Sequence, residues 1–350
     1  MSPKIERLSS FEFDHGEVIV DVRSPSEFKE DHIPGSINLP VLSDNEFKKV
    51  GTIYKEVSPF DASKIGAALV SKNISTHLGE YFYDKPQTTK FVFYCARGGK
   101  RSSSFAQVCS MVGWPTCVID GGYKAYRKHV TGSIEKLCNG YKFLLIGGKT
   151  GTGKTEILNH LEVKGYDVLN LERLAVHRGS LLGAHKDQDQ PAQKLFETRI
   201  FEKIKTFNDQ KTIFAEAESN KIGRVFIPAA LWKKMKAAPI FIIENQNEHR
   251  VSFILKEYDP DFLQRKAIPN LLSFIDKKSN AIDTEKLRKL VSEGKWSEFV
   301  QEILTSHYDP LYQHAISKRI APIVKRLQIN QPVEQSIPYL CQELIEACGS

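Results

Sequence analysis

The sequence lacks the patterns that place a protein in a membrane or outside the cell. No apolar run approaches the ~18 residues that cross a bilayer, and residues 1–7 contain no apolar signal core. The six cysteines form no Cys-x-x-Cys pair and show no metal-ligand spacing, and no repeat or low-complexity tract occurs. We therefore expect a cytoplasmic protein with reduced thiols, no structural metal and no membrane partner.

A large excess of charge of one sign is also missing. The 350 residues include 49 Lys and Arg against 42 Asp and Glu, a formal net charge of +7. This balance favours a nucleic-acid or other polyanionic partner only weakly. With 41% hydrophobic and 26% charged residues, the composition indicates a globular protein, and the length suggests about two domains.

A glycine-rich stretch near the middle of the chain matches the phosphate-loop pattern Gly-x-x-x-x-Gly-Lys-Ser/Thr. It lies between a strand predicted over residues 141–146 and a helix predicted over 156–162. Such a loop turns several backbone N–H groups toward one anion, its lysine adds charge, and its threonine can hold Mg²⁺. The pattern leaves open whether the ligand is a nucleotide, a diphosphate ester or a phosphorylated substrate. The predicted phosphate-binding residues are Gly148, Lys149, Thr150, Gly151, Thr152, Gly153, Lys154 and Thr155, with Thr155 as the Mg²⁺ ligand.

A second loop contains the cysteine that we expect to be the nucleophile. Cys95 follows a strand predicted over residues 90–94 and is followed by glycines, cations and a helix predicted over 105–112. Converging N–H groups and positive charge stabilise a thiolate, so its pKa should fall below the free-thiol value of about 8.5. The other five cysteines lack such neighbours and are expected to be inert. The predicted anion loop around Cys95 consists of Arg97, Gly98, Gly99, Lys100, Arg101 and Ser102.

Polar residues follow two further predicted strands, over 165–171 and 211–219, in the second half of the chain. Residues at the carboxyl ends of strands lie on the ligand side of an open α/β sheet, and an acidic residue there commonly orients Mg²⁺ or water. Their chemistry alone fits a solvated loop about as well as a site wall. The supporting candidates are His177, Arg178 and Ser180, then Glu216 and Glu218, between which we do not choose, and Arg224.

Strands and helices alternate through both halves, which predicts an α/β protein with parallel sheets. Beyond Arg250 helical patterning dominates, and residues 321–327 are included in it. We expect an N-terminal domain over 1–135, a phosphate-loop domain over 140–255 and a helical C-terminal extension of that domain over 256–350.

The N-terminal part resembles rhodanese domains. The resemblance rests on Asp21-Val22-Arg23, on the string from His32 to Pro40 and on the segment 121–127. In many rhodaneses an arginine stands five residues after the cysteine, whereas here Lys100 holds that position and Arg101 follows. The longer loop resembles the phosphatase and arsenate-reductase relatives of the fold, whose cradle fits a tetrahedral phosphate-type anion.

The chain as a whole resembles the tRNA 2-selenouridine synthase family. The resemblance adds to the rhodanese-like part and the phosphate loop the segments 177–180, 216–219 with Ile222-Gly223, and 308–312. It implies a P-loop NTPase-like second domain and a transferase acting on 2-thiouridine at the wobble position of tRNA. The family is understood to geranylate the sulfur with geranyl diphosphate, and then to replace the S-geranyl group with selenium from selenophosphate. A selenophosphate supplier is therefore an implied partner.

Three other functions remain open from the residues. One is an ATP-dependent tRNA sulfurtransferase on the same scaffold. Another is a Cys-x5-Arg phosphatase fused to a kinase-like domain, although no aspartate stands just after the cysteine loop to act as its acid. The last is a binding module in which the rhodanese-like domain is only a docking platform.

Overall fold

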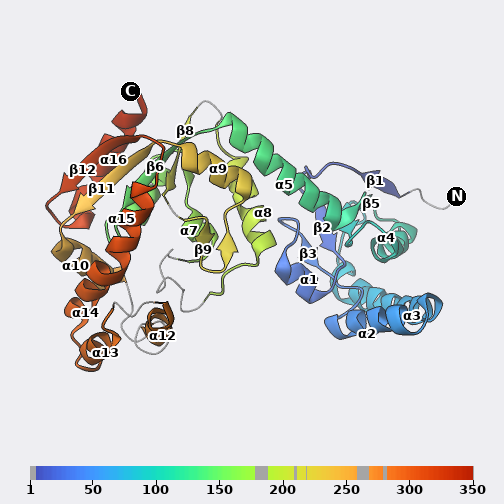
Figure 1. The fold of residues 1–350 in the computed structure, drawn as a ribbon. Coiled ribbons are helices and arrows are strands. Elements are labelled where there is room, and N and C mark those ends of the chain that lie inside the picture. Colours follow the sequence, from blue (N-terminus) through green and yellow to red (C-terminus); the bar gives the residue numbers. More distant parts are fainter. Residues whose placement is uncertain are drawn as a thin grey trace. The chain divides into compact units, whose positions relative to one another are not determined.

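The structure is a computed structural model that describes residues 5–177, 188–208, 211–217, 219–257, 268–278 and 282–349. The chain forms two compact units, Met1–Gly132 and Ser133–Ser350 (Figure 1). Each contains its own parallel sheet. This confirms the predicted α/β class with parallel sheets.

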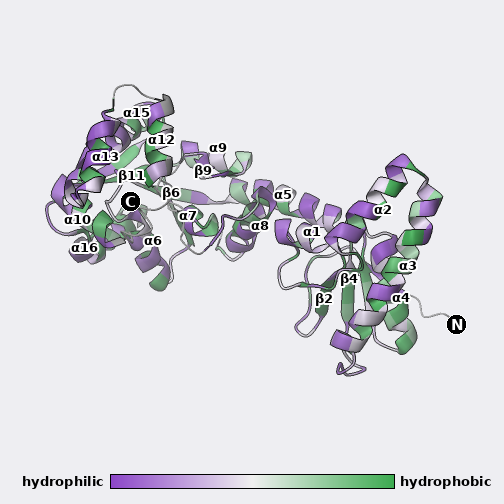
Figure 2. Ribbon diagram, turned by 90° about the horizontal axis from the view of Figure 1, so that it is seen from below, coloured by the Kyte–Doolittle hydropathy of each residue, from purple (hydrophilic) through white to green (hydrophobic). Residues whose placement is uncertain are grey.

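The first unit is built on a five-stranded sheet of order β1-β5-β4-β2-β3, in which every neighbouring pair is parallel. The apolar residues of β2 and β4 make these strands largely green in Figure 2. All four residues of β4 are buried, so its carboxyl end is fixed by packing on both faces. The strands are β1 Glu6–Leu8, β2 Val18–Asp21, β3 Ile37–Asn38, β4 Phe91–Tyr94 and β5 Thr116–Ile119.

Serine caps start three helices of this unit. Ser24 precedes α1 and its N–H donates to Glu27 at 3.1 Å, as a capping box requires. Ser43 and Ser58 accept hydrogen bonds from the first-turn N–H groups of α2 and α3. The helices are α1 Pro25–Glu30, α2 Asp44–Glu56, α3 Pro59–His77, the π-helix η1 Leu78–Phe82, α4 Lys100–Val112 and α5 Gly122–Gly140, which runs on into the second unit.

The second unit has a five-stranded parallel sheet of order β12-β11-β6-β8-β7 and a small β9-β10 hairpin. The strand that leads into the phosphate loop, β6, is central, between β11 and β8. The strands are β6 Lys142–Gly148, β7 Val168–Leu169, β8 Thr212–Glu216, β9 Lys221–Ile222, β10 Val225–Phe226, β11 Ile240–Asn245 and β12 Ile323–Ile329.

Helices cover this sheet and continue toward the C-terminus. The described helices are α6 Lys154–Val163, α7 Leu171–Leu174, α8 Gln193–Ile204, α9 Ala229–Ala237, α10 Asn247–Glu257, α12 Ile268–Lys278, α13 Thr284–Ser292, α14 Trp296–Ile303, the π-helix η3 Leu304–Tyr308, α15 Asp309–Ser317 and α16 Val333–Gly349. Apolar residues of α10 to α14 form a separate core that includes Val251, Leu271 and Phe299. Among the described helices, none is long and apolar enough to span a bilayer.

The prediction of a helix over residues 321–327 is wrong, because residues 323–327 belong to the edge strand β12. It pairs in parallel with β11, whose residues are almost all buried. Most of β12 is exposed, with only Ile329 buried, and the apolar residues Ile323, Val324 and Leu327 have the spacing of a helix, so the local pattern does not indicate a strand. Pairing with β11, some 80 residues earlier, decides its conformation.

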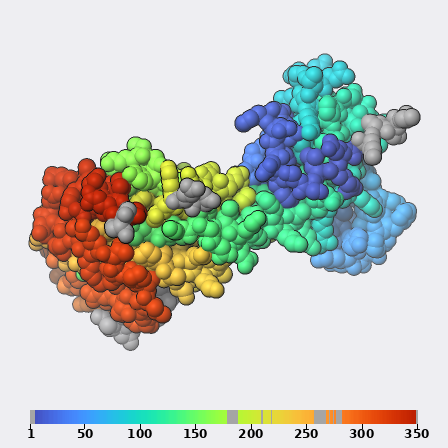
Figure 3. Space-filling view, turned by 90° about the horizontal axis from the view of Figure 1, so that it is seen from above, coloured from blue at the N-terminus to red at the C-terminus, as the bar shows by residue number. Residues whose placement is uncertain are grey.

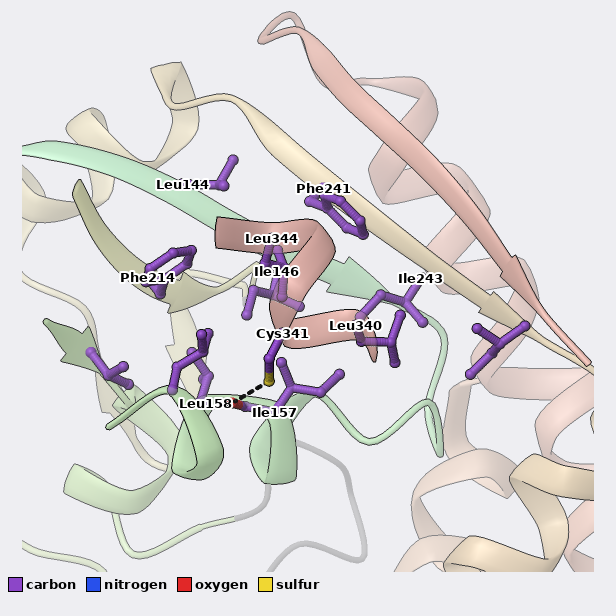
Figure 4. Packing of buried hydrophobic residues seen from close by; sticks show 13 residues of the cluster. Leu144, Ile146, Ile157, Leu158, Phe214, Phe241, Ile243, Leu340, Cys341 and Leu344 are labelled. Atoms are coloured by element: carbon purple, nitrogen blue, oxygen red, sulfur yellow. Dashed lines mark hydrogen bonds between the residues drawn. The ribbon is translucent and has the colours of Figure 1, made fainter. Parts of the chain in front are cut away.

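The last helix completes the core of the second unit. Leu340, Cys341 and Leu344 of α16 pack on Ile157 of α6 and on the sheet, and the Cys341 thiol donates to the Ile157 carbonyl at 3.8 Å (Figure 4). In Figure 3 the C-terminal residues (red) lie beside earlier residues of the same unit (bright green) on one face of the molecule, in agreement with the packing of α16 on α6. The C-terminal segment is therefore an integral part of the fold around the phosphate loop.

Candidate functional site

The Cys95 loop joins β4 to α4 in the first unit. Cys95 is only 3% exposed and directly follows the last residue of β4. Two glycines make the path of the loop possible, Gly98 with φ +62° and Gly122 with φ +55°. A Cβ atom on Gly122 would lie 2.2 Å from the Cys95 carbonyl oxygen. The start of α5 thus approaches the loop more closely than any side chain permits.

Hydrogen-bond donors surround the sulfur of Cys95. The Gly99 N–H donates to Sγ at 3.2 Å and the Ser102 hydroxyl at 3.3 Å. The backbone N–H groups of Arg97 and Ser102 also lower the pKa of this thiol. Burial raises the pKa of the thiol, but these donors outweigh burial and hold the pKa below the ordinary thiol value. The expectation of a lowered thiol pKa is confirmed.

The other cysteines lie in the opposite situation, since burial without such donors disfavours their thiolates. Burial raises the pKa of Cys109 to about 12 and those of Cys117, Cys138 and Cys341 to about 11, and it also raises the pKa of Cys348. Of the six cysteines, Cys95 is the one whose pKa is lowered, and its role as a nucleophile stays a prediction.

The three cations near Cys95 contribute less to the stabilisation of its thiolate than expected. Arg97 and Lys100 are exposed. The Nη1 of Arg101 donates to Glu27 at 3.0 Å, and its guanidinium lies 5.1 Å from the centroid of the Phe47 ring. Glu27 neutralises Arg101, so the thiolate is stabilised mainly by N–H and hydroxyl donors at the start of α4.

A buried charge cluster supports the Cys95 loop from behind, and its role was not predicted from the sequence. Arg23 donates to Asp21 at 2.6 Å and to the Asp31 carbonyl at 2.7 Å, and its guanidinium lies 3.8 Å from the Tyr123 ring centroid. The Tyr123 hydroxyl donates to Asp31 at 2.9 Å, while its N–H donates to the Cys95 carbonyl at 2.9 Å. The cluster fixes α5 against the loop. The signal for it was present in the Asp21-Val22-Arg23 string.

The phosphate loop begins where β6 ends and leads into α6. Gly151 and Gly153 have φ +85° and +79°, values that favour glycine. A Cβ atom on Gly148 would lie 2.5 Å from the Thr152 hydroxyl, and one on Gly153 would lie 2.3 Å from Val333. Each of these glycines is therefore required either by its backbone angle or by a close neighbour. Gly153 is also the N-terminal cap of α6, whose first turn offers its N–H groups to an anion.

Lys154 and Thr155 stand at the start of α6. The ammonium of Lys154 donates to the Gly148 carbonyl at 2.9 Å, across the mouth of its own loop. The Thr155 hydroxyl donates to Glu172 Oε2 at 3.2 Å, and the Glu172 N–H donates to Glu216 Oε1 at 2.7 Å. Glu172 was not among the predicted residues, because nothing in the local sequence shows that α7 reaches the loop.

The oxygen atoms gathered here are of the kind that Mg²⁺ prefers. Thr155 supplies a hydroxyl, and the Glu172 carboxylate lies beside it. Glu216 is 2% exposed and holds the backbone of Glu172, so it supports this group from behind. Within the described ranges, no group of three or more His, Cys, Asp or Glu residues is arranged to hold a metal. Thr155 and Glu172 therefore fit a Mg²⁺ ion whose remaining ligands are water molecules and the oxygens of a bound phosphate.

A buried ion pair lies behind the outer half of the phosphate loop. Arg250 donates to both Asp309 oxygens at 2.6 and 2.9 Å, and its Nε donates to the Thr150 carbonyl at 2.9 Å. Lys149 donates to the same carboxylate at 3.0 Å. Burial raises the pKa of Asp309, but Arg250 and Lys149 outweigh this and lower it. Arg250 was missed because 100 residues separate it from the loop.

The remaining candidates lie in different places. His177 is buried just after α7, and its N–H donates to the Glu172 carbonyl at 3.0 Å. Arg224 lies in the exposed β9-β10 turn, where its guanidinium donates to the Gln190 carbonyl. This contact gives Arg224 a local role in the turn. Arg178, Ser180 and Glu218 lie outside the described residues.

The fold and the two loops define the class of protein, a rhodanese-like domain joined to a phosphate-loop domain. The family model for the rhodanese-like domain matches residues 7–129, and the model for the tRNA 2-selenouridine synthase AAA domain matches residues 141–338. These matches confirm the predicted fold class. The chain belongs to the tRNA 2-selenouridine synthase family.

Three tRNA 2-selenouridine synthases show the extent of the similarity. The one from Shewanella halifaxensis is 31% identical over 335 residues, which cover 87% of this chain and 90% of the relative. The one from Shewanella piezotolerans is 31% identical over 338 residues, with 87% and 90% covered. The one from Nitrosomonas europaea is 28% identical over 349 residues, with 86% and 89% covered. The similarity therefore extends over both units.

Proposed function

We propose that this chain converts 2-thiouridine at the wobble position of tRNA to 2-selenouridine in two steps, one at each loop. The observation that supports two steps is that one chain of this family contains two loops with different chemistry. The Cys95 loop holds a thiol of lowered pKa, whereas the phosphate loop holds Lys154 and Thr155 and no cysteine.

In the first step the phosphate loop binds geranyl diphosphate. The thiouridine sulfur attacks the first geranyl carbon, the bond from that carbon to oxygen breaks, and diphosphate leaves with the electron pair while the base loses a proton. Lys154 leaves the Gly148 carbonyl and neutralises charge on the departing diphosphate. Mg²⁺ held by Thr155 and the neighbouring Glu172 would supply further neutralisation. Alkylation makes the sulfur a better leaving group for the second step.

In the second step the Cys95 loop binds selenophosphate, a tetrahedral anion. Its donors, the first-turn N–H groups of α4 with Arg97 and Lys100 nearby, suit such an anion. Selenium keeps its electron pair as it is delivered to the ring carbon, geranyl thiol leaves, and phosphorus ends as phosphate after attack by water. A perselenide on Cys95 would instead release phosphite, and a thiol would then have to supply two electrons to cleave the bond between the Cys95 sulfur and selenium. The phosphorus product therefore separates these routes.

The substrate and the donor supply follow from this chemistry. A tRNA already carrying 2-thiouridine binds through its phosphates, to which lysine and arginine contacts give sequence-independent affinity. An enzyme that forms selenophosphate must supply the second donor.

The test is to incubate the purified chain with thiolated tRNA and each donor, then to digest the tRNA and weigh the nucleosides. Geranyl diphosphate alone should give geranylated thiouridine and release diphosphate, and adding selenophosphate should give 2-selenouridine and phosphate. A tRNA-stimulated hydrolysis of ATP with no use of geranyl diphosphate would instead support the sulfurtransferase. Unchanged tRNA with both donors present would refute the proposal.

A further inference from the structure

Backbone carbonyl groups limit how a phosphate loop can be built. When its N–H groups face an anion, its carbonyl oxygens must face away and find donors elsewhere. Here the Lys149 carbonyl accepts from the Thr152 hydroxyl at 2.9 Å, a donor within the loop. The Thr150 carbonyl accepts from Arg250 Nε at 2.9 Å, a donor 100 residues away in α10. The conformation at Thr150 therefore depends on a distant side chain.

The surroundings of Arg250 leave it little freedom. Its residue is 0% exposed, and its two terminal nitrogens donate to Asp309 and to Asn247, the latter at 2.7 Å. Its own carbonyl oxygen would lie 2.9 Å from a Cβ atom on Gly151. Both the backbone and the side chain of Arg250 thus press against the outer half of the loop.

The same cluster adds positive charge beside the loop. Arg250 and Lys149 share the single carboxylate of Asp309, so two cations face one anion. The excess positive charge is close to the N–H groups that would receive a phosphate, and a site of low exposure screens it weakly.

We propose that Arg250, oriented by Asp309, is a positioning residue that holds the Thr150 carbonyl outward so that the phosphate loop is preformed for diphosphate. The inference rests on the proposed function, since it takes diphosphate as the ligand. Arg250 acts through the loop and does not touch the ligand, because its buried donors are directed at Thr150, Asn247 and Asp309.

The variant Arg250→Lys tests this. Lysine keeps the charge that pairs with Asp309 but cannot bond Asp309 and the Thr150 carbonyl in the same fork geometry. The matched control is Arg319→Lys, in which the same exchange removes bonds to the Met235 and Ala238 carbonyls at the end of α9. Titration calorimetry with inorganic diphosphate and Mg²⁺ gives the affinity, and thermal unfolding gives the stability of each full-length variant.

We expect Arg250→Lys to weaken diphosphate binding about tenfold or more, the effect of losing one charge-assisted hydrogen bond that orders the loop, while Arg319→Lys binds like the unaltered chain. If Arg250→Lys and the unaltered chain bind diphosphate with equal affinity, the inference about Arg250 is overturned while the proposed function is not. Equal weakening in both variants would also overturn it, since it would reflect general loss of stability. If the unaltered chain does not bind diphosphate, the proposed ligand of the phosphate loop is wrong, and the proposed function and this inference both fail.

A second variant keeps the test decisive if Arg250→Lys does not fold. Asp309→Glu keeps the charge of the cluster but moves the carboxylate by one methylene group, so that the geometry that orients Arg250 is lost. We expect it to weaken diphosphate binding in the same direction, whereas unchanged affinity would overturn the inference.

Discussion

The hydroxyl of Ser102 lies 3.3 Å from the sulfur of Cys95, within the first turn of α4. The same hydroxyl is 3.2 Å from the Gly99 carbonyl, so its one proton has two acceptors. A thiolate is the stronger acceptor of the two. Ionisation of Cys95 should therefore turn the Ser102 proton toward sulfur and reinforce the thiolate.

We expect Ser102→Ala to move the pH dependence of Cys95 alkylation to higher pH. The pKa of Cys95 is lowered in the folded chain, so its thiolate forms at a lower pH than an ordinary thiol, and loss of this donor raises that pKa. Iodoacetamide labelling followed by peptide mass spectrometry measures the profile. Alkylation near neutral pH should slow several-fold, because less thiolate is present. Ser104→Ala, an exposed serine of the same helix that bonds the Lys100 carbonyl, should leave the profile unchanged.

Gly122→Ala should destabilise the first unit by about 2 kcal/mol. The new methyl group would meet the Cys95 carbonyl at 2.2 Å and the Gly98 nitrogen at 2.5 Å, and backbone atoms cannot move aside easily. Gly132→Ala is the control in the same helix, since a Cβ there meets nothing within 4 Å. It should be neutral or add about 0.5–1 kcal/mol of stability. Denaturant unfolding followed by circular dichroism checks both, and an unfolding midpoint for Gly122→Ala equal to that of the unaltered chain would show that the loop adjusts.

Separate losses should follow from variants in the two loops. Cys95→Ser should abolish selenium incorporation and leave geranylation largely intact. Lys154→Ala should reduce geranylation about 100-fold, because one cation that neutralises the leaving diphosphate is lost. Nucleoside mass spectrometry measures both products. Loss of both steps in Cys95→Ser would contradict the division of labour, and full retention of modification would support the docking-platform function.

Chelation of Mg²⁺ should slow release of diphosphate from geranyl diphosphate. The Thr155 hydroxyl beside Glu172 is the protein ligand that we propose for the ion. Thr155→Ser keeps a hydroxyl and should retain activity, whereas Thr155→Val has the same shape without it and should need more Mg²⁺ for half-maximal rate. Diphosphate release at graded Mg²⁺ concentrations is the measurement, and identical Mg²⁺ curves for Ser and Val would assign the ion elsewhere.

Local patterns predicted much of what the structure contains, for a physical reason. The strand before Cys95 and the strand before the phosphate loop are buried on both faces, so their residues form continuous apolar runs that are visible in the sequence. The loops after them need glycines at positive φ, which leaves a spacing that is also visible. Patterning failed at β12, where most residues are exposed and pairing with a distant strand decides the conformation.

The contacts that surround each loop come from elsewhere in the chain. Tyr123 reaches Cys95 from the start of α5, and Glu172 reaches Thr155 from α7. Arg250 reaches Thr150 and pairs with Asp309, although 59 residues separate Arg250 from Asp309. Local periodicity does not predict these long-range contacts, because they depend on how the helices pack against the sheet.

The sequence by itself determined the two loops, their order and which cysteine has a lowered pKa, since a phosphate loop and a thiolate-stabilising loop both need particular residues at short spacing. Only the tertiary structure decided which groups stabilise them. It shows that hydroxyl and N–H donors, more than Arg101, lower the pKa of Cys95, and that a buried Arg250-Asp309 pair supports the phosphate loop. Burial gives these interactions their strength, and burial exists only once distant segments have packed together.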